Sequence, residues 1–343
     1  MRIGLIAPVA LQVPPTGYGG TERVVSVLAD GLVARGHEVT LFASGDSCTR
    51  ARLHALYPHA LTHLTEKAAY QPYETAHVAE AMRLARHFDV LHDHTKVTGV
   101  LEARFCPTPV ITTVHNDFTT ERRMVYGAYP GHRYVAISQA HARRMPELNF
   151  VGTVYNGLDL GETVFRAEKD DYLLFLGRLD AAKGAGIAAR LAAELDLPLI
   201  MAGRKEPGYF DREIAPYMDG KRRRFIGEVS GRPKWELYAG ARALIFPIQW
   251  EEPFGLVMIE ALACGTPVLA TRRGSVPEIL TPETGVIVPD GDFAALAAGL
   301  EGVLRLDPRA CRRRVEEHFS AARMVEAYEA VYAREAAAPG LAA

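Results

Sequence analysis

Two glutamates, Glu252 and Glu260, stand on either side of a short turn, with seven residues between them. The apolar run at residues 243–248 predicts a buried strand, and the run at residues 256–264 predicts a helix that ends at Gly265. Glu252 would then follow the carboxyl end of a strand, which is where open α/β sheets bind their ligands.

The groups around these acids fit a phosphorylated, hydroxylated ligand. The amides around residues 254–257, from Phe254 to Val257, would be free donors at the N-terminus of the helix and suit a phosphate. The carboxylate of Glu260 could accept hydrogen bonds from both hydroxyls of a ribose. The alternative is a surface helix with acids near its N-terminus. That alternative does not explain an acid within an apolar run, so we favour a binding role.

Two cations, Arg178 and Lys183, occupy the loop after another predicted strand, and a helix is expected to begin near Gly184. Cations at this edge of a sheet can neutralise a pyrophosphate. The pattern is not a Walker phosphate-binding loop, because GxxxxGK[ST] is absent. Exposed cations beside a glycine turn are common, so this motif alone is not specific.

The first predicted helix is preceded by Gly19 and Gly20, which would let the backbone approach a ligand closely. The third glycine of a dinucleotide-binding fingerprint is replaced by Glu22, so that motif fails. We expect a ligand-facing loop, with Thr21 as the helix cap.

His115 follows a predicted strand and could donate to a sugar hydroxyl or a phosphate oxygen. Residues 92–94, His-Asp-His, end the preceding predicted strand. A metal site is an alternative for these histidines, but their spacing matches no recognised site. We expect a hydrogen-bonded wall and no metal, and we expect Ser138 to cap the following helix.

The remaining pattern alternates apolar runs with amphipathic or alanine-rich runs, which is typical of parallel sheets covered on both faces. Strands are expected at residues 3–7, 38–43, 90–92, 110–114, 134–137, 172–176, 199–202, 224–226, 243–246, 268–270 and 286–288. Helices are expected at residues 21–34, 74–86, 97–103, 187–195, 256–264 and 320–334. The fold class is therefore α/β, with two doubly wound, Rossmann-like domains.

A polar segment at residues 162–171 is the expected linker, which gives domains at residues 1–163 and 164–319. The final helix, residues 320–335, is expected to return to the first domain and complete it. Its apolar face would carry Met324, Val325, Tyr328, Val331 and Tyr332.

The composition limits the class of protein. The chain has 343 residues, of which 48% are hydrophobic and 23% charged. Its net charge of −2 lacks the basic excess of nucleic-acid binders, so no nucleic-acid partner is expected. The basic clusters at residues 221–224 and 312–314 are interpreted as solvated faces or as the basic bias of helix C-termini, rather than as partner sites. With no signal peptide and no membrane-length apolar run, we expect a cytoplasmic protein; peripheral membrane contact stays open.

In their order along the chain, these motifs resemble those of the retaining glycosyltransferases of sequence family 4, or group 1, which have the GT-B fold. The resemblance covers essentially the whole chain and rests on Gly19-Gly20, His115, Ser138, Asn156-Gly-Leu-Asp159, Gly177-Arg178, Lys183-Gly184, Glu252-Pro-Phe-Gly-Leu256, Glu260-Ala261 and Val276-Pro-Glu278. It implies two Rossmann-like domains that face one another across a cleft, with the donor in the C-terminal domain and the acceptor presented by the N-terminal domain.

The resemblance also implies roles for single residues. Arg178 and Lys183 would hold the donor's diphosphate, and Glu260 its ribose. Glu252 would contact hydroxyls of the donor sugar, and His115 would face the reacting sugar. Further donor contacts are implied for a set of backbone and base-lining positions: Gly19, Gly20, Phe225, Ile226, Phe254, Gly255 and Leu256.

The implied function is retaining, metal-independent and cofactor-free transfer of a hexosyl group from a nucleoside-diphosphate sugar to a hydroxyl acceptor. UDP-sugars and GDP-mannose both occur with this signature, and we favour a UDP-sugar. The acceptor, whether a sugar, a lipid-linked sugar or a small molecule, stays open because residues 44–73 match no motif. The alternatives are a nucleotide-sugar isomerase of similar architecture and a non-catalytic homologue that binds a nucleotide-sugar.

Overall fold

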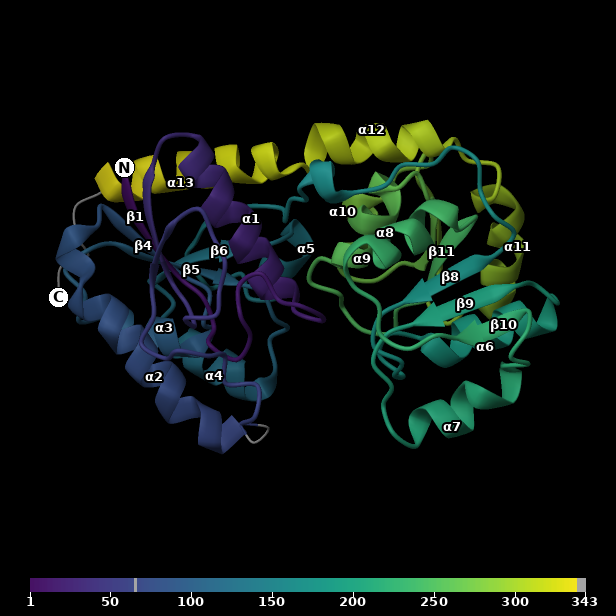
Figure 1. The fold of residues 1–343 in the computed structure, drawn as a ribbon, viewed down its shortest axis with the longest axis horizontal. Helices are drawn as coiled ribbons and strands as arrows, with labels where there is room; N and C mark the ends of the chain where they lie inside the picture. Colours follow the sequence, from purple (N-terminus) through teal and green to yellow (C-terminus); the bar gives the residue numbers. More distant parts are fainter. Residues whose placement is uncertain (65–66, 338–343) are drawn as a thin grey trace. The chain divides into compact units, whose positions relative to one another are not determined.

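The structure is a computed structural model that describes residues 1–64 and 67–337. It divides into two compact units (Figure 1). Unit 1 contains residues 1–157 together with the helix α13 (Ala321–Ala337), and unit 2 contains residues 158–320. Within the segment 44–73, residues 65 and 66 lie outside the described residues.

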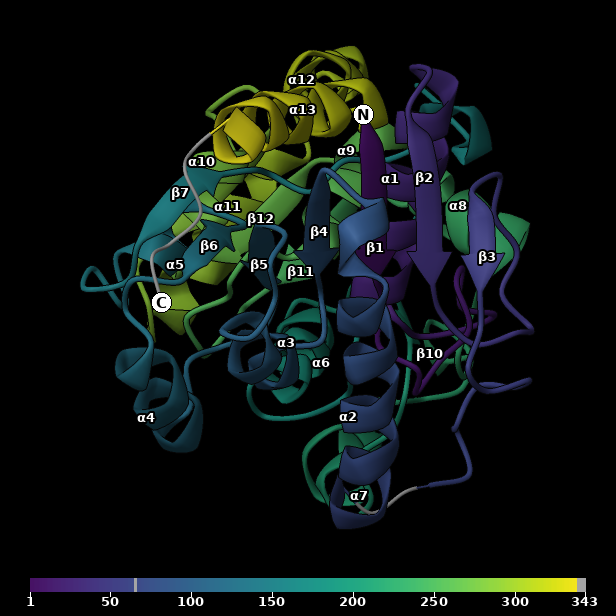
Figure 2. The ribbon, with the colours of Figure 1, turned by 90° about the vertical axis from the view of Figure 1, so that its left-hand side faces the viewer.

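Unit 1 is built on a parallel seven-stranded sheet with the order β3-β2-β1-β4-β5-β6-β7, which Figure 2 shows along its breadth. The strands are β1 (Arg2–Ile6), β2 (Glu38–Phe42), β3 (Arg52–His54), β4 (Val90–Asp93), β5 (Val110–Val114), β6 (Arg133–Ala136) and β7 (Phe150–Thr153). The central strands are buried throughout, as their continuous apolar runs predict.

The helices of unit 1 alternate with these strands. They are α1 (Gly20–Ala34), α2 (Lys67–Arg83), the 3-10 turn η1 (Ala85–His87), α3 (Val97–Ala103), α4 (Thr120–Ala128) and α5 (Gln139–Ala142). The helix α1 begins at Gly20 with Gly19 at its N-cap, so the prediction that Thr21 caps it is wrong. The ladder already starts with Arg23 N–H donating to the Gly19 carbonyl, which places Thr21 inside the first turn.

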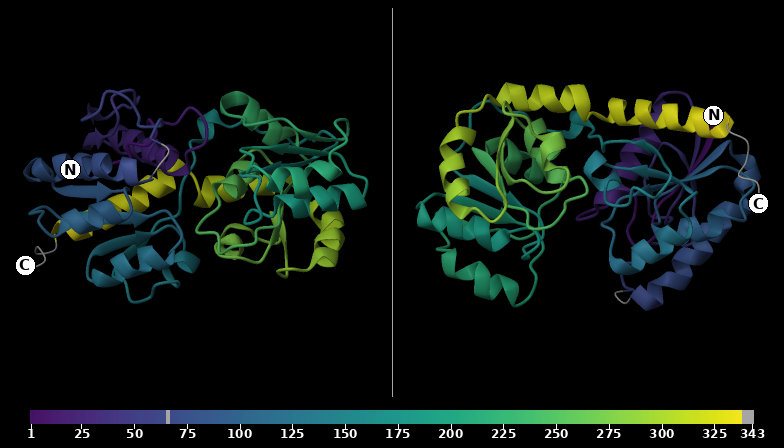
Figure 3. Two further views of the ribbon diagram at one scale, coloured as in Figure 1. Left: turned by 90° about the horizontal axis from the view of Figure 1, so that it is seen from below. Right: turned by 180° about the vertical axis from the view of Figure 1, so that it is seen from behind.

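The C-terminal helix α13 packs on unit 1 against α1 and β4 (Figure 3). All five residues of its predicted apolar face are buried. The hydroxyls of Tyr328 and Tyr332 reach Thr113 and His92 at 2.9 and 2.6 Å. The helix is therefore held to the sheet by buried hydrogen bonds as well as by apolar contact.

Unit 2 has a parallel six-stranded sheet with the order β10-β9-β8-β11-β12-β13. The strands are β8 (Leu173–Leu176), β9 (Leu199–Ala202), β10 (Arg223–Phe225), β11 (Ala243–Phe246), β12 (Val268–Thr271) and β13 (Gly285–Val288). The helices and 3-10 turns are η2 (Leu160–Glu162), α6 (Ala185–Glu194), α7 (Tyr209–Glu213), η3 (Ala215–Tyr217), α8 (Gly231–Gly240), α9 (Leu256–Ala263), α10 (Val276–Ile279), α11 (Phe293–Val303) and α12 (Pro308–His318).

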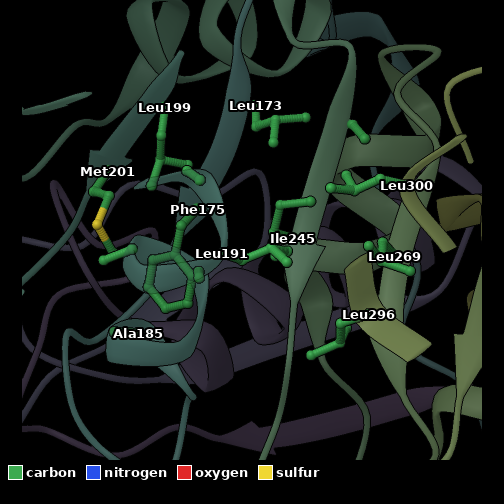
Figure 4. Packing of buried hydrophobic residues seen from close by; sticks show 14 of the residues in the cluster. Leu173, Phe175, Ala185, Leu191, Leu199, Met201, Ile245, Leu269, Leu296 and Leu300 are labelled. Carbon is green, nitrogen blue, oxygen red and sulfur yellow. The ribbon is translucent and has the colours of Figure 1, made fainter. Parts of the chain in front are cut away.

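One face of this sheet packs on α6 and α11 to form a core (Figure 4). Each large apolar side chain buried there contributes about 1.5–3 kcal/mol to folding. The labelled members are Leu173, Phe175, Ala185, Leu191, Leu199, Met201, Ile245, Leu269, Leu296 and Leu300.

The polar segment at residues 162–171 is part of unit 2, not a free linker. Lys169 Nζ donates to the carbonyls of Ala239 and Cys264 and to the Thr266 hydroxyl, at 2.9–3.2 Å. A charged residue of this segment therefore caps backbone carbonyls at the C-terminal ends of α8 and α9. The division between the units follows Gly157, whereas the sequence places it after residue 163.

Each sheet has one point at which the strand order reverses. In unit 1 it lies between β1 and β4, and in unit 2 between β8 and β11. The loops that leave two such strands diverge to opposite faces of the sheet, and open α/β folds bind ligands in the crevice between them.

Candidate functional site

The reversal point of unit 2 brings a cation and an acid together. Lys183 lies in the loop after β8, and Glu252 lies in the loop after β11, the neighbouring strand. Lys183 Nζ is 2.5 Å from Glu252 Oε2, and the two side chains are 17% and 9% exposed. A positive and a negative group thus meet where the fold is expected to bind a ligand.

A buried aspartate that the sequence analysis did not single out organises the cationic loop. Asp180 accepts a hydrogen bond from the Lys183 amide at 2.8 Å, and it pairs with Arg178 at 3.2 Å. Gly184 ends the loop in the left-handed region with φ +70°, and a Cβ there would lie 2.0 Å from the Pro247 carbonyl oxygen. The glycine therefore lets α6 start directly against the β11 loop.

Trp250 completes the surroundings of Glu252. Its indole Nε1–H donates to Glu252 Oε2 at 3.0 Å, and Lys183 Nζ lies 4.9 Å from the centre of its ring. The indole and the ammonium thus hold the same carboxylate oxygen, and Oε1 is engaged by neither of them. This fixes the direction in which Glu252 presents its second oxygen.

The start of α9 has the geometry expected of an anion site. Gly255 is the N-cap, with φ +76°, and Leu256 is the first helical residue. The Phe254 carbonyl accepts from the Ser275 hydroxyl at 2.7 Å, which ties the turn to the loop after β12. The Met258 amide donates to the Gly255 carbonyl at 3.0 Å, which leaves the amides of Leu256 and Val257, the first two of the helix, to donate to a ligand.

Glu260 is buried in α9 and is already bound by two donors from α8. Lys234 Nζ lies 2.7 Å from its Oε1, and the Tyr238 hydroxyl donates to its Oε2 at 3.0 Å. The sequence analysis identified neither partner. Each carboxylate oxygen has about two lone pairs, so one site on each oxygen remains after these two bonds.

Phe225 and Ile226 lie at the carboxyl end of β10, two strands away from β8. At a spacing of about 4.8 Å between strands, they are about 10 Å along the edge of the sheet from the cationic loop. Ile226 is 41% exposed, whereas the Phe225 ring packs on Phe210 and lies 4.5 Å from Lys205 Nζ. The edge thus offers an apolar surface at one end and charged groups at the other.

In unit 1, Gly19 is the N-cap of α1 and Gly20 its first residue, and β1, which precedes them, borders the reversal point of that sheet. A Cβ at Gly19 would lie 2.8 Å from Pro15 atoms and 2.9 Å from Leu11, so the close packing of this loop requires glycine. The amides of the first turn of α1 face the same edge of the sheet.

His115 follows β5 and meets His94, which follows the neighbouring strand β4. The rings stack with centroids 5.1 Å apart, and His94 Nδ1 lies 2.8 Å from His115 Nε2. Although part of His115 is exposed, burial above all, together with nearby His141, lowers its pKa to about 3. The ring is therefore neutral near pH 7 and can form hydrogen bonds without carrying charge.

The side chains of His92, Asp93 and His94 do not converge on one point. Side chains alternate along a strand, so His92 and Asp93 point to opposite faces of the sheet. His92 lies between the hydroxyls of Tyr332 and Thr113, and Asp93 accepts from two threonine hydroxyls. Within residues 1–64 and 67–337, no group of three or more His, Cys, Asp or Glu is arranged to hold a metal ion.

The basic clusters are engaged within unit 2. Arg222 and Arg223 both pair with Asp196, and Arg312 bonds to Glu316 and to the Ala263 carbonyl. These arginines are therefore held by contacts within unit 2, whereas the sequence analysis interpreted their clusters as solvated faces.

Two family models together cover most of the chain. That of "Glycosyltransferase Family 4" matches residues 18–162, and that of "Glycosyl transferases group 1" matches residues 162–318. The chain belongs to the group 1 glycosyltransferases. The fold expected of such a glycosyltransferase, two parallel-sheet Rossmann-like domains of the GT-B class, is confirmed.

Relatives of this glycosyltransferase match along nearly their whole length. A phosphatidyl-myo-inositol mannosyltransferase of Mycolicibacterium smegmatis is 28% identical, with 90% of this chain and 86% of that protein covered. A glycogen synthase of Mycobacterium tuberculosis is 27% identical, with 90% and 88% covered. The solved structure of a glycosyltransferase involved in avilamycin A biosynthesis is 27% identical, with a TM-score of 0.76 and 98% of both chains covered.

No helix in the part of this glycosyltransferase that the structure describes is long and apolar enough to cross a membrane.

Proposed function

We propose that this glycosyltransferase moves a hexosyl group from a nucleoside-diphosphate sugar to a hydroxyl acceptor, with retention of the donor's anomeric configuration and without a metal ion. The observation that carries this proposal is the 2.5 Å contact between Lys183 and Glu252. In such a donor the anomeric carbon joins the sugar to the diphosphate. Groups that bind these two parts must therefore lie side by side, as this cation and this acid do.

The roles in unit 2 follow from charge and position. Arg178 and Lys183 would neutralise the diphosphate, together with the first two amides of α9, those of Leu256 and Val257. Glu252 would accept hydroxyls of the hexose through its Oε1. These cations and amides supply the positive potential that a metal ion provides in other phosphate sites, which supports a metal-free reaction.

The remaining contacts are proposed from the family resemblance. Glu260 would accept the ribose hydroxyls, and the exposed Ile226 would lie against the base. In unit 1, Gly19 and Gly20 would approach the phosphates. His115 would donate to the reacting sugar as a neutral ring, since burial lowers its pKa to about 3.

Retention requires that the acceptor arrive on the face from which the diphosphate leaves. The bond between the anomeric carbon and the phosphate oxygen breaks, and its electron pair stays on that oxygen. The acceptor oxygen forms the new bond to the anomeric carbon, and its proton passes to the leaving phosphate. The charge that develops on the leaving oxygen lies beside Arg178 and Lys183, which stabilise it more in the transition state than in the bound donor.

A UDP-sugar is the donor that we favour. The names of the relatives do not agree on the sugar, because one is a mannosyltransferase and another makes glycogen. A thermal-shift screen of UDP- and GDP-sugars identifies the donor directly, since a ligand at a hundred times its dissociation constant adds about 2.7 kcal/mol of apparent stability.

The product then tests the reaction. With the donor identified, proton NMR of the new glycosidic bond should show the anomeric configuration of the donor. An inverted bond would contradict retention. Conversion of the donor to an epimer in the absence of any acceptor would instead support the isomerase alternative, and binding without any turnover would support the non-catalytic one.

A further inference from the structure

A lysine and a tyrosine on α8 hold the carboxylate of Glu260 away from bulk water. The side chains of Lys234 and Glu260 are 8% and 6% exposed, and their charged atoms lie 2.7 Å apart. The ammonium also lies 4.1 Å from the centre of the Trp235 ring. Tyr238 donates to the other carboxylate oxygen at 3.0 Å.

Packing of α8 against α9 does not by itself require this arrangement. The neighbours of Glu260 along α9 are apolar and buried. A buried ion pair contributes little net stability, because both charges lose their hydration, and apolar side chains of similar size often stabilise as well or better. A charged carboxylate held at this position therefore points to a task other than holding the two helices together.

The geometry of these contacts leaves the Glu260 carboxylate able to accept further hydrogen bonds. Lys234 and Tyr238 are four residues apart, so they lie on the same face of α8 and approach Glu260 from one side. Each binds a different oxygen, which fixes the plane of the carboxylate and leaves about one lone-pair site on each oxygen. Two adjacent hydroxyls, such as those of a ribose, match two acceptor sites in one plane.

We propose that Lys234 and Tyr238 are positioning residues that hold the Glu260 carboxylate oriented to accept the 2′- and 3′-hydroxyls of the donor's ribose. This inference rests on the proposed function, in which Glu260 binds the ribose. Lys234 holds Oε1 of the carboxylate through the ion pair, and Tyr238 holds Oε2, so the two contacts together fix the rotation of the carboxylate.

The test compares ribose with deoxyribose. UDP, GDP and ADP are titrated against the full chain by calorimetry, and the one that binds is compared with its 2′-deoxy and 3′-deoxy forms. Loss of a hydroxyl that donates to a carboxylate should weaken binding by about ten- to a hundredfold in the unmodified protein.

Lys234→Met removes the ion pair that holds Glu260 Oε1, so the carboxylate can turn out of the plane in which it would meet the ribose hydroxyls. The preference for ribose should then fall by about tenfold. Lys234→Arg keeps the cation and should restore the preference. The matched control is Arg232→Met. The Arg232 side chain lies on the same helix and is 81% exposed, so the preference of this variant for ribose should not change.

Tyr238→Phe removes only a hydroxyl, and it carries the test even if Lys234→Met does not fold. A preference for ribose that falls in both variants and not in the control supports the proposal. An unchanged preference with a lowered thermal midpoint overturns it, because the pair would then be purely structural. A protein that binds a nucleoside diphosphate without preferring ribose overturns this inference alone, whereas one that binds none overturns the proposed function as well.

Discussion

Arg178 and Lys183 are proposed to do the same work on the donor, but the structure holds them differently. Lys183 pairs with Glu252, and both side chains are largely buried, at 17% and 9% exposure. Arg178 is 37% exposed and pairs with Asp180 at 3.2 Å. We therefore predict that Arg178→Ala and Lys183→Ala lose turnover alike and differ in stability.

The expected loss of turnover follows from the charge that develops on the leaving oxygen. Removing one electrostatic contact of this kind commonly slows the chemical step by about a hundred- to a thousandfold. Because the benefit is larger in the transition state than in the bound donor, kcat should fall more than donor affinity. Steady-state kinetics together with calorimetric binding of the donor separates the two effects.

The expected losses of stability differ because of burial. Breaking a buried ion pair by removing one partner costs about 3 kcal/mol or more, since it leaves the other charge uncompensated. For a unit of this size, that lowers the thermal midpoint of Lys183→Ala by about 6–12 °C. Arg178 is more exposed than Lys183, and its buried partner Asp180 keeps the hydrogen bond from the Lys183 amide. We therefore expect Arg178→Ala to cost about 1 kcal/mol or less and to shift the midpoint by about 4 °C or less.

Two further variants make this prediction decisive. Glu252→Gln introduced into Lys183→Ala removes the uncompensated charge, so it should recover part of the lost stability and none of the turnover. Arg305→Ala, which removes a cation that is 75% exposed just after the end of α11, is the control and should change neither property. Near-normal turnover in Arg178→Ala and Lys183→Ala would refute the assignment of the diphosphate to this loop.

Three other predictions concern the metal, the pH dependence and the backbone. Turnover should survive excess EDTA; loss of activity that magnesium or manganese restores would contradict the metal-free mechanism. Burial lowers the pKa of several histidines in unit 1, to about 4 for His77 and His132 and to about 3 for His115. These pKa values lie below the usual 6.5, so the unfolded chain binds more protons. Each such group thus removes up to about 1.4 kcal/mol of stability per pH unit as the pH falls from about 6.5 to 4. Asp93, whose pKa burial raises to about 7, opposes this trend, as do Glu22 and Glu74, whose pKa values burial also raises. The histidines of unit 1 with a lowered pKa are more numerous: His77, His92, His94, His115, His132 and His141. Hydrogen exchange at pH 7 and pH 5 should show unit 1 opening before unit 2, and equal protection of both units would contradict this. An unfavourable φ alone costs about 1–3 kcal/mol. Gly184→Ala should lower the stability of the protein by more than this, because its Cβ would also clash with the Pro247 carbonyl. Gly220→Ala, at φ +72° with nothing within 4 Å of a Cβ, should show the cost of φ alone in thermal denaturation.

The sequence alone determined the elements whose signal is local. The strands β5, β9 and β11 and the helix α3 begin and end at the predicted residues. Strands buried on both faces are continuous apolar runs, and such runs can be recognised without knowledge of their neighbours. The same holds for the apolar face of α13, whose spacing predicts a buried helix wherever the helix lies.

Elements with a weak local signal were missed or misplaced. The strands β3 and β7 lie at the two edges of their sheet, and none of their residues is fully buried. Their sequences therefore lack the apolar run that identifies a central strand. The segment 162–171 was interpreted as a linker because it is charged, although Lys169 binds carbonyl groups of unit 2. Polarity in a sequence does not distinguish a solvated lysine from one that caps buried backbone.

The candidate site divides in the same way. The types and spacing of Arg178, Lys183, Glu252 and Glu260 were enough to single them out. The contacts that these residues make could not be predicted in the same way. Lys183 and Glu252 are 69 residues apart, and Glu260 is 26 residues from Lys234. The first pair meets because the strand order of the sheet makes β8 and β11 neighbours, and the second meets because α8 packs against α9. Residue types specify what chemistry is available, whereas contacts over such separations depend on the order of the strands and the packing of the helices, which only the tertiary structure decides.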